Sequence, residues 1–232
     1  MSRALLQRVA AGELPETVRL ARPGAMVAFG KQDAVAAGYA EAVRAARAGG
    51  FEPVLRLAGG RAAVFHKQTI ALAHAVPDPA PRMGIHSRFS WTADLIARAL
   101  RRLGVDARVG DVPGEYCPGG YSVNARGAVK LAGIGQRLVA GASHMGGVIV
   151  AGDASRVRDV LVPVYDALDL DWDPGTTGAV EDEADASVRP SWAAVRDALL
   201  AEYGREYAIV EAELDPETIA LAHELAPEHR PR

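Results

Sequence analysis

Apolar and polar residues are arranged along the chain in a pattern that predicts short strands in the middle, with helices between and after them. Apolar residues recur at helical spacing over 3–12, 33–48 and 90–103, where Asp33 and Ser90 are expected to cap the second and third helices. Later helices are expected over 155–170, 191–203 and 215–226. Strands are expected over 17–22, 25–30, 53–60, 61–66, 69–76, 121–125, 128–138 and 146–152. This order of elements is typical of an α+β domain.

Length and cysteine content limit the class of protein. The 232 residues fit one large domain, or one domain with a small appendage, and such a chain folds without help from a metal or a disulfide. Its single cysteine fits a reducing compartment. The first residues lack the apolar stretch of a secretion signal, and no later run reaches membrane-spanning length. We therefore expect a cytoplasmic protein that does not enter a membrane.

Charge is distributed unevenly along the sequence. Residues 1–165 contain 21 Lys and Arg against 12 Asp and Glu, whereas residues 166–232 contain 5 against 17. A basic body favours an anionic partner, such as an acidic protein or a phosphate-bearing substrate, although arginines scattered over the surface explain the surplus equally well. Nucleic acid is not expected, because aromatic residues make up only 6% and no nucleic-acid-binding motif is present.

Lysine is rare in this chain, which has 23 Arg but only Lys31, Lys67 and Lys130. Lys130 lies inside the apolar, strand-like run "AVKLAGIGQR". An ammonium that faces inward there needs a partner or a ligand, because burial of an unpaired charge is costly. The period-two alternation equally allows an outward-facing lysine on an edge strand.

Paired glycines stand between two apolar runs in the segment "RLAGGRAAVFH", residues 56–66. Gly59 and Gly60 allow the backbone to approach a ligand and to present N–H groups to an anion, with Arg56 and Arg61 adding charge. A tight turn explains the glycines as well. The six histidines lack the spacing of a metal site, so no metal is expected. His144, in "GASHMGG", is either a polar contact or a plain turn residue.

The single cysteine, Cys117, lies in the segment "GEYCPGG", which proline and glycine keep from continuing a helix or a strand. A thiol on such a loop is accessible to a large substrate, and its thiolate is a strong nucleophile. Lys130 follows beyond a hairpin turn expected at Arg126-Gly127 and could return toward the thiol. An incidental surface thiol is the alternative.

Taken in order, "RLAGGRAAVFH", "GEYCPGGYSV" and "VKLAGIGQRLVAGASHMGGVIVAGD" resemble the lipoate and octanoate attachment family of lipoate–protein ligases, octanoyltransferases and related biotin ligases. The resemblance covers residues 1 to about 165. It implies an α+β fold in which a mixed, mainly antiparallel sheet flanked by helices forms an acyl pocket. It also implies a catalytic domain over 1–175, and an acidic linker and C-terminal helices over 176–232 that pack on the same domain.

The resemblance assigns roles by position: the glycine pair lines the pocket, and Lys130 contacts the acyl carbonyl or its activated form. The residues expected to bind the acyl group or the substrate are Arg56, Gly59, Gly60, Arg61, His66, Gly133, Gln136, Arg137 and His144. A cysteine followed by Pro-Gly just before the lysine strand resembles the cysteine-dependent octanoyltransferases. It looks most like those that move octanoyl from the glycine-cleavage H protein to lipoyl domains.

This resemblance implies a two-step transfer without a cofactor. Cys117 takes the acyl group as a thioester, Lys130 stabilises the thiolate and the developing oxyanion, and a lysine of a lipoyl domain resolves the thioester. The expected partners are the glycine-cleavage H protein, acyl carrier protein or the lipoyl domains of 2-oxoacid dehydrogenases. Lys130, as a pocket-lining ammonium, is expected to contribute function and little stability.

Two alternatives stay open. An ATP-dependent lipoate–protein ligase would need ATP and Mg²⁺ in the same pocket. Such ligases carry Arg-Arg-x-Ser-Gly-Gly-Gly, whereas residues 55–61 here read Leu-Arg-Leu-Ala-Gly-Gly-Arg, which weakens this alternative. The other is a catalytically silent subunit that binds an acyl group or a carrier protein.

Overall fold

Two β-sheets form the framework of the protein, whose computed structural model describes residues 1–185, 187 and 189–231. The larger sheet has antiparallel strands in the order β1-β5-β9-β8-β7-β6. Its strands are β1 (Thr17–Ala21), β5 (Thr69–Pro77), β6 (Ala107–Val109), β7 (Val123–Ala125), β8 (Val129–Val139) and β9 (Ala142–Val150). The smaller sheet contains β3 (Glu52–Leu55), β2 (Met26–Phe29) and β4 (Ala63–Phe65), with β2 parallel to β3 and antiparallel to β4. The predicted α+β fold with a mixed, mainly antiparallel sheet is confirmed.

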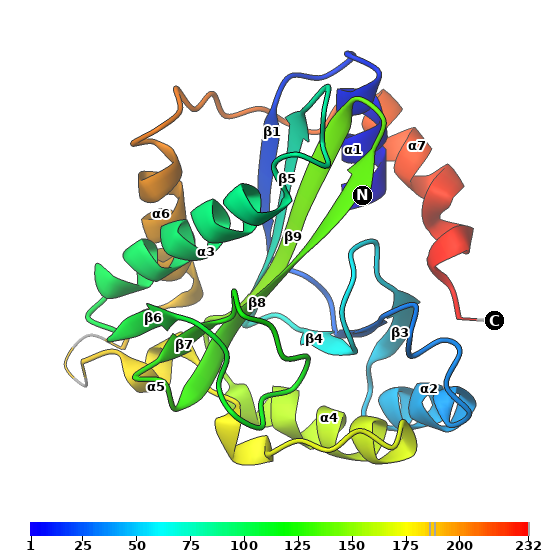
Figure 1. The fold of residues 1–232 in the computed structure, drawn as a ribbon, viewed down its shortest axis with the longest axis vertical. Coiled ribbons are helices and arrows are strands. Elements are labelled where there is room, and N and C mark those ends of the chain that lie inside the picture. The colour runs from blue at the N-terminus through cyan, green and yellow to red at the C-terminus, as the bar shows by residue number, and fades with distance from the viewer. Residues whose placement is uncertain (186, 188, 232) are drawn as a thin grey trace.

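Helices cover both sheets from outside. They are α1 (Ser2–Ala10), α2 (Tyr39–Ala48), α3 (Ile85–Arg101), α4 (Ala154–Ala167), α5 (Val180–Glu183), α6 (Trp192–Tyr203) and α7 (Pro216–Leu225). Figure 1 shows α3 and α6 together beside the larger sheet, α2 and α4 together beneath the smaller one, and α1 next to α7. Across the described residues, no helix has both the length and the apolar character needed to cross a lipid bilayer.

Helix α2 begins at Tyr39, later than the sequence predicts. Asp33 does not cap it. The Asp33 carboxylate accepts the Gly30 N–H at 2.8 Å and pairs with the Arg61 guanidinium at 3.2 Å. Asp33 therefore closes a turn after β2 and links that turn to residues 56–62 between β3 and β4, here called the glycine segment. Local sequence does not reveal this long-range role.

Two other expectations also differ from the structure. Helix α3 begins at Ile85, so Ser90 lies inside the helix rather than at its N-terminus. The strands expected over 53–60 and 61–66 are shorter and do not form a hairpin, because β2 lies between β3 and β4. The glycine segment between them is consequently a longer loop that crosses the end of β2.

A β-bulge in β8 decides which of its side chains face the smaller sheet. Strand β7 pairs neighbouring residues with Lys130 and Ala132, so Leu131 between them is an extra residue. Such an insertion resets the alternation of faces along the strand. Lys130 and Gly133 consequently share a face, and a Cβ on Gly133 would lie 3.2 Å from the Lys130 Cε. The bulge thus turns Lys130 inward.

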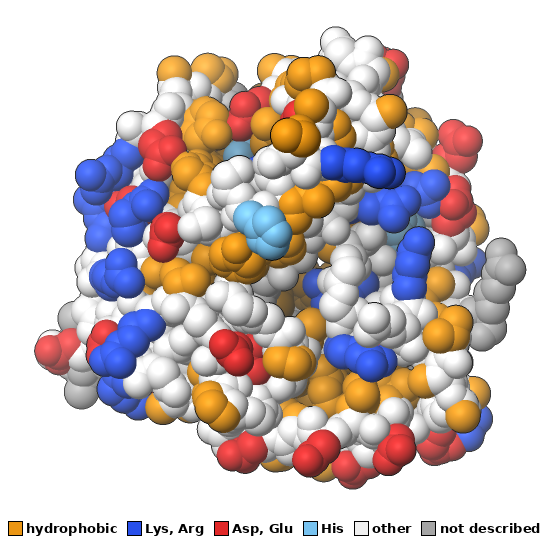
Figure 2. Space-filling model, in the orientation of Figure 1, with side chains coloured by type: hydrophobic (Ala, Val, Ile, Leu, Met, Phe, Trp, Pro, Cys, Tyr) orange, Lys and Arg blue, Asp and Glu red, His pale blue; other side chains and the backbone are white. Residues whose placement is uncertain are grey.

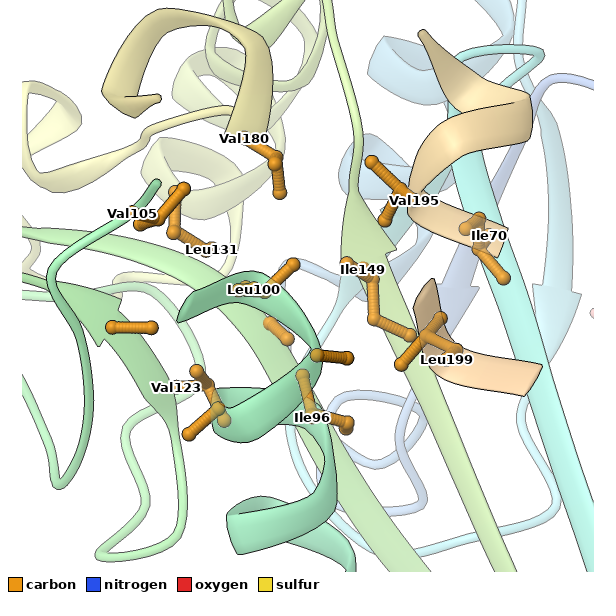
Figure 3. Packing of buried hydrophobic residues seen from close by; sticks show 14 of the residues in the cluster. Ile70, Ile96, Leu100, Val105, Val123, Leu131, Ile149, Val180, Val195 and Leu199 are labelled. Atoms are coloured by element: carbon orange, nitrogen blue, oxygen red, sulfur yellow. The ribbon is translucent and has the colours of Figure 1, made fainter. Parts of the chain in front are cut away.

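The main hydrophobic core lies between the larger sheet and helices α3 and α6 (Figure 3). Residues from both layers interlock there, including Ile70, Ile96, Leu100, Val105, Val123, Leu131, Ile149, Val180, Val195 and Leu199. A second core joins the smaller sheet to α2 and α4. Each sheet is therefore held by its own set of helices.

Replacing Leu100 with Ala should lower the free energy of unfolding by roughly 2–5 kcal/mol, because the buried side chain leaves a cavity in the main core. The matched control is Leu200→Ala on α6, where the residue is 36% exposed. The control should cost roughly 0.5 kcal/mol. Urea unfolding followed by circular dichroism measures both, and equal losses would contradict the central place of α3 in the core.

Candidate functional site

A cavity of about 1180 Å³ lies between the two sheets. Its walls are largely apolar, with Ala28, Ala63 and Phe65 from the smaller sheet and Ala71 and Val148 from the larger one. Figure 2 shows the surface hollowed near the centre of the view, with Lys and Arg side chains beside the hollow. Apolar walls with a few polar groups are typical of sites for small, mainly apolar ligands.

Glycines allow the glycine segment to lie close against both sheets at this cavity. A Cβ on Gly135 of β8 would lie 3.0 Å from the Gly59 carbonyl oxygen, and a Cβ on Gly30 would overlap the Gly60 carbonyl. Any side chain at these positions would push the segment outward. The glycine segment is thus held between β8 and the end of β2.

Cys117 presents its thiol to the glycine segment. The Cys117 Sγ accepts the backbone N–H of Arg61 at 3.2 Å, and a guanidinium nitrogen of Arg56 lies 3.8 Å from it. The Cys117 N–H donates to the Tyr165 hydroxyl at 2.9 Å, and this hydroxyl donates to the Ala62 carbonyl at 3.0 Å. One backbone donor and one guanidinium are therefore positioned to interact with a negatively charged sulfur.

Backbone conformation and space both require glycine at position 60. Gly60 has a φ of +111°, which side chains rarely allow. A Cβ there would lie 2.9 Å from both the Cys117 Sγ and the Arg56 Nη1. The second glycine of the pair therefore makes room for the thiol and for the cation beside it.

Lys130 contacts the backbone of the cysteine loop, residues 110–122 between β6 and β7, rather than the thiol. Its Nζ donates to the Glu115 Oε1 at 3.0 Å, the Tyr116 carbonyl at 3.0 Å and the Cys117 carbonyl at 2.8 Å. The residue is only 1% exposed, and its ammonium lies 4.9 Å from the centre of the Tyr116 ring. All three ammonium hydrogens thus have acceptors. From the sequence we expect the Lys130 ammonium to stabilise the Cys117 thiolate. In the structure the cation beside the Cys117 sulfur is instead the Arg56 guanidinium.

Glu115 organises the rest of the loop. Its carboxylate accepts the Ser122 hydroxyl at 2.6 Å, the Gly119 N–H at 3.1 Å and the Val112 N–H at 3.2 Å, in addition to the Lys130 ammonium. These donors offset most of the free-energy cost of removing the Glu115 carboxylate from water. Glu115 and Lys130 together hold the loop against β8.

Most of the candidate residues meet at the cavity. The structure brings together Arg56, Gly59, Gly60, Cys117, Lys130, Gly133 and His144 along its lining. Gln136 also borders it, but the Gln136 Oε1 accepts the guanidinium of Arg88 at 2.7 and 2.9 Å and its amide donates to the Ile85 carbonyl. Gln136 therefore anchors α3 to β8.

Three other candidates lie elsewhere. The Arg61 side chain binds Asp33, so Arg61 contributes to the site through its backbone N–H. His66 is buried in the turn between β4 and β5, where its Nδ1 accepts the Gln68 N–H at 3.3 Å. Arg137 is exposed and is not part of the cavity lining, although its neighbours Gln136 and Leu138 are. Within the described residues, no group of three or more His, Cys, Asp or Glu side chains has the arrangement of a metal site.

His144 is a neutral, buried polar group in the lining. It is 3% exposed, and within the described part of the chain its Nδ1 has no hydrogen-bond partner. Burial, assisted by the nearby His74, lowers the pKa of His144 to about 4. At neutral pH the ring is therefore uncharged and carries one N–H donor.

Sequence reasoning missed four residues that build or line the site. They are Asp33, Glu115, Tyr165 and Arg19. Glu115 stands two positions before the cysteine in "GEYCPGG", and this proximity was the available signal. Asp33 and Tyr165 act over long separations in sequence, which no local pattern records.

The family model of the lipoyl protein ligase A/B catalytic domain matches residues 1–202. The chain belongs to this family. An octanoyl-[GcvH]:protein N-octanoyltransferase of Geobacillus kaustophilus is 30% identical over 138 residues, 60% of this chain and 48% of that protein. One of Bacillus velezensis is 26% identical over 183 residues, 78% of this chain and 63% of that protein. The chain therefore spans about half of the first relative and less than two thirds of the second.

Solved structures share the catalytic fold of the family at low sequence identity. A putative lipoate protein ligase of Thermoplasma acidophilum with bound lipoic acid has a TM-score of 0.73 and 19% identity, over 98% of this chain and 90% of that chain. A lipoate-protein ligase A bound with ATP has a TM-score of 0.70 and 18% identity, over 97% of this chain and 88% of that chain. The predicted lipoate-ligase-like fold is confirmed.

Replacing Lys130 with Met should lower the free energy of unfolding by roughly 3–5 kcal/mol, because the buried Glu115 carboxylate loses its cationic partner. This geometry predicts the opposite of the small stability effect expected from the sequence. The double variant Glu115→Gln/Lys130→Met should recover part of the loss, since the buried charge is then absent. Urea unfolding measures the three proteins, and a Lys130→Met variant as stable as the wild type would contradict the pairing.

Stability should fall as pH decreases from about 6.5 toward 4, because the unfolded chain then binds a proton that folded His144, with its pKa of about 4, does not take up. Through this group alone the loss at pH 5 is about 2 kcal/mol. His144→Gln should show a correspondingly smaller difference between urea unfolding at pH 7 and at pH 5. Parallel pH profiles for the two proteins would contradict a buried, neutral His144.

Proposed function

We propose that the chain is an octanoyltransferase that moves an octanoyl group from the glycine-cleavage H protein to a lysine of a lipoyl domain, with Cys117 as the intermediate acyl carrier. The position of Cys117 carries this proposal. The only cysteine of the chain lines an apolar cavity, with the Arg61 N–H and the Arg56 guanidinium beside its sulfur. The relatives named octanoyl-[GcvH]:protein N-octanoyltransferases support the same reaction.

The proposed reaction exchanges one amide for another. The Cys117 thiolate attacks the carbonyl carbon of octanoyl-lysine on the H protein; a carbon–sulfur bond forms, the carbon–nitrogen bond breaks, and the lysine amine leaves with a proton. The neutral amine of the lipoyl-domain lysine then attacks the thioester, an amide forms, and the thiolate leaves. The proton released by this second amine balances the one taken up by the first. No ATP is consumed.

Each group at the site has a physical role in these steps. The Arg61 N–H and the Arg56 guanidinium stabilise negative charge on sulfur before attack and after departure. Lys130 is a positioning residue, because it binds the carbonyl of Cys117 and so fixes the backbone that carries the thiol. The apolar walls around Ala28, Ala63 and Val148 accommodate the octanoyl chain.

An ATP-dependent ligase would instead activate a free acid with ATP and Mg²⁺. Where the ligases carry the last glycine of their run, this chain has Arg61, whose side chain is held by Asp33. This departure, together with the thiol at the cavity wall, favours the transferase.

Octanoyl-loaded H protein, incubated with the chain without ATP, should leave one octanoyl group on the chain. Intact mass spectrometry should detect this adduct, and neutral hydroxylamine should remove it, because it is a thioester. Cys117→Ala should form no adduct and transfer nothing to a lipoyl domain. Cys117→Ser should accumulate a stable ester, since an alkoxide leaves less readily than a thiolate.

The control reaction supplies free octanoate or lipoate with ATP and Mg²⁺. If modification of the lipoyl domain requires ATP and persists in Cys117→Ala, the chain is a ligase and the transferase proposal fails. If neither reaction proceeds while the chain still binds octanoyl-loaded H protein, the chain is a silent binding subunit.

A further inference from the structure

Arg19 places a cation in the cavity that the proposed transfer does not use. Its side chain lines the cavity from β1 and is partly buried. Among the described residues it has neither a hydrogen bond nor an ion pair, and desolvation lowers its pKa with no carboxylate to oppose the shift. A guanidinium withdrawn from water without a partner is costly, which points to a ligand that supplies one.

The other arginine and lysine side chains of the lining differ from Arg19 because each is paired or exposed. Arg3 pairs with Glu228 at 2.6 Å, Arg22 lies 4.4 Å from the centre of the Trp192 ring, Lys130 and Arg56 are hydrogen-bonded around the cysteine loop, and Arg230 is exposed. Glu52, an exposed carboxylate of the lining, makes no ion pair with Arg19. Arg19 is thus the cationic side chain of the described lining that is available to an anion. The Met1 ammonium belongs to the same lining, and its pKa is lowered by burial and by the nearby Arg19.

His144 adds a second unpaired polar group to the same part of the cavity. Its ring is almost fully buried, and its Nδ1 has no partner within the described residues. Across the larger sheet, Arg19 pairs with Ala73 and Ala73 with Gly146, and a Cβ on Gly146 would lie 2.8 Å from the His144 Nε2. Arg19, Gly146 and His144 therefore lie on the same face of the larger sheet, and the Arg19 and His144 side chains both line the space above this face.

This space lies across the larger sheet from the thiol. Gly146 pairs with Gly135, which supports Gly59 of the glycine segment next to Cys117. From β1 to β8 there are three strand spacings, about 14 Å. An acyl chain that starts at Cys117 and crosses the floor of the cavity ends toward Arg19 and His144.

We propose that Arg19 and His144 form an anion subsite that binds a carboxylate at the far end of the acyl group. The acyl group would then be an ω-carboxyacyl chain of octanoyl length, bound more tightly than octanoyl itself. The fork of the guanidinium matches a carboxylate, and the neutral imidazole donates one further N–H. This inference refines the proposed function, since it specifies the acyl group that Cys117 carries.

Isothermal titration calorimetry with the full chain tests the subsite without any transfer step. The probes are N-methyloctanamide and octanedioic acid mono-N-methylamide, which differ only in the terminal carboxylate. Wild type should bind the carboxylate probe about tenfold more tightly or better, the effect of one charge-assisted interaction. Arg19→Met should reverse this preference, and Arg19→Lys, which keeps the charge, should retain part of it. His144→Phe should weaken binding of the carboxylate probe alone.

Arg47→Met is the matched control, because it removes an exposed arginine on α2 outside the cavity lining. It should leave the preference for the carboxylate probe unchanged. A wild type that prefers N-methyloctanamide, or a preference that survives in both Arg19→Met and His144→Phe, would overturn the subsite. If Cys117 forms no thioester but the carboxylate preference holds, the transferase proposal fails and the subsite stands.

Discussion

The site depends on the buried ion pair between Glu115 and Lys130. Both residues are almost completely removed from water, so each charge needs compensation within the protein. The Glu115 carboxylate accepts hydrogen bonds from N–H and hydroxyl groups of the cysteine loop, and the Lys130 ammonium donates to backbone carbonyls of the same loop. Moving the loop away from β8 would leave two unpaired charges in an apolar interior. This constraint explains how Cys117 is held at a φ of 45°, a conformation that non-glycine residues seldom adopt.

A large cavity between two sheets needs a physical cause, because protein interiors are normally close-packed. Here each sheet is stabilised by its own core and helices, so neither relies on the other to bury its apolar residues. Glycines on the inner face of the larger sheet, at 133, 135 and 146, leave the floor without side chains. The glycine segment rests on this floor at one end and brings the Arg61 N–H to the thiol. Space for a ligand and the environment of the Cys117 thiol therefore arise from the same group of glycines.

Local patterns predicted the elements but not their long-range contacts. The alternation of apolar residues located β5, β8 and the second half of β9, whose first residues at 142–145 were not predicted as strand. Arg126-Gly127 formed the expected turn with φ of 57° and 74°. The inward direction of Lys130 follows from the bulge at Leu131, which alternation alone cannot reveal. Asp33 looked like a helix cap because its partner, Arg61, is distant in sequence. The position of Cys117 on a loop was predictable from the sequence, whereas the groups around its thiol depend on tertiary packing.

The C-terminal segment completes the cavity outside the part of the chain that the family shares. The family match ends at residue 202, whereas Ala222, Leu225 and His229 line the cavity. The ring Nδ1–H of His229 donates to the Leu55 carbonyl at 2.6 Å, and Arg8 of α1 pairs with Asp215 just before α7, so this segment is fixed to β3 and α1. Cys117 and the two donors beside its sulfur, the Arg61 N–H and the Arg56 guanidinium, all lie within the match. Most of the cavity lining thus lies within the family match, and the C-terminal segment adds one further wall from outside it.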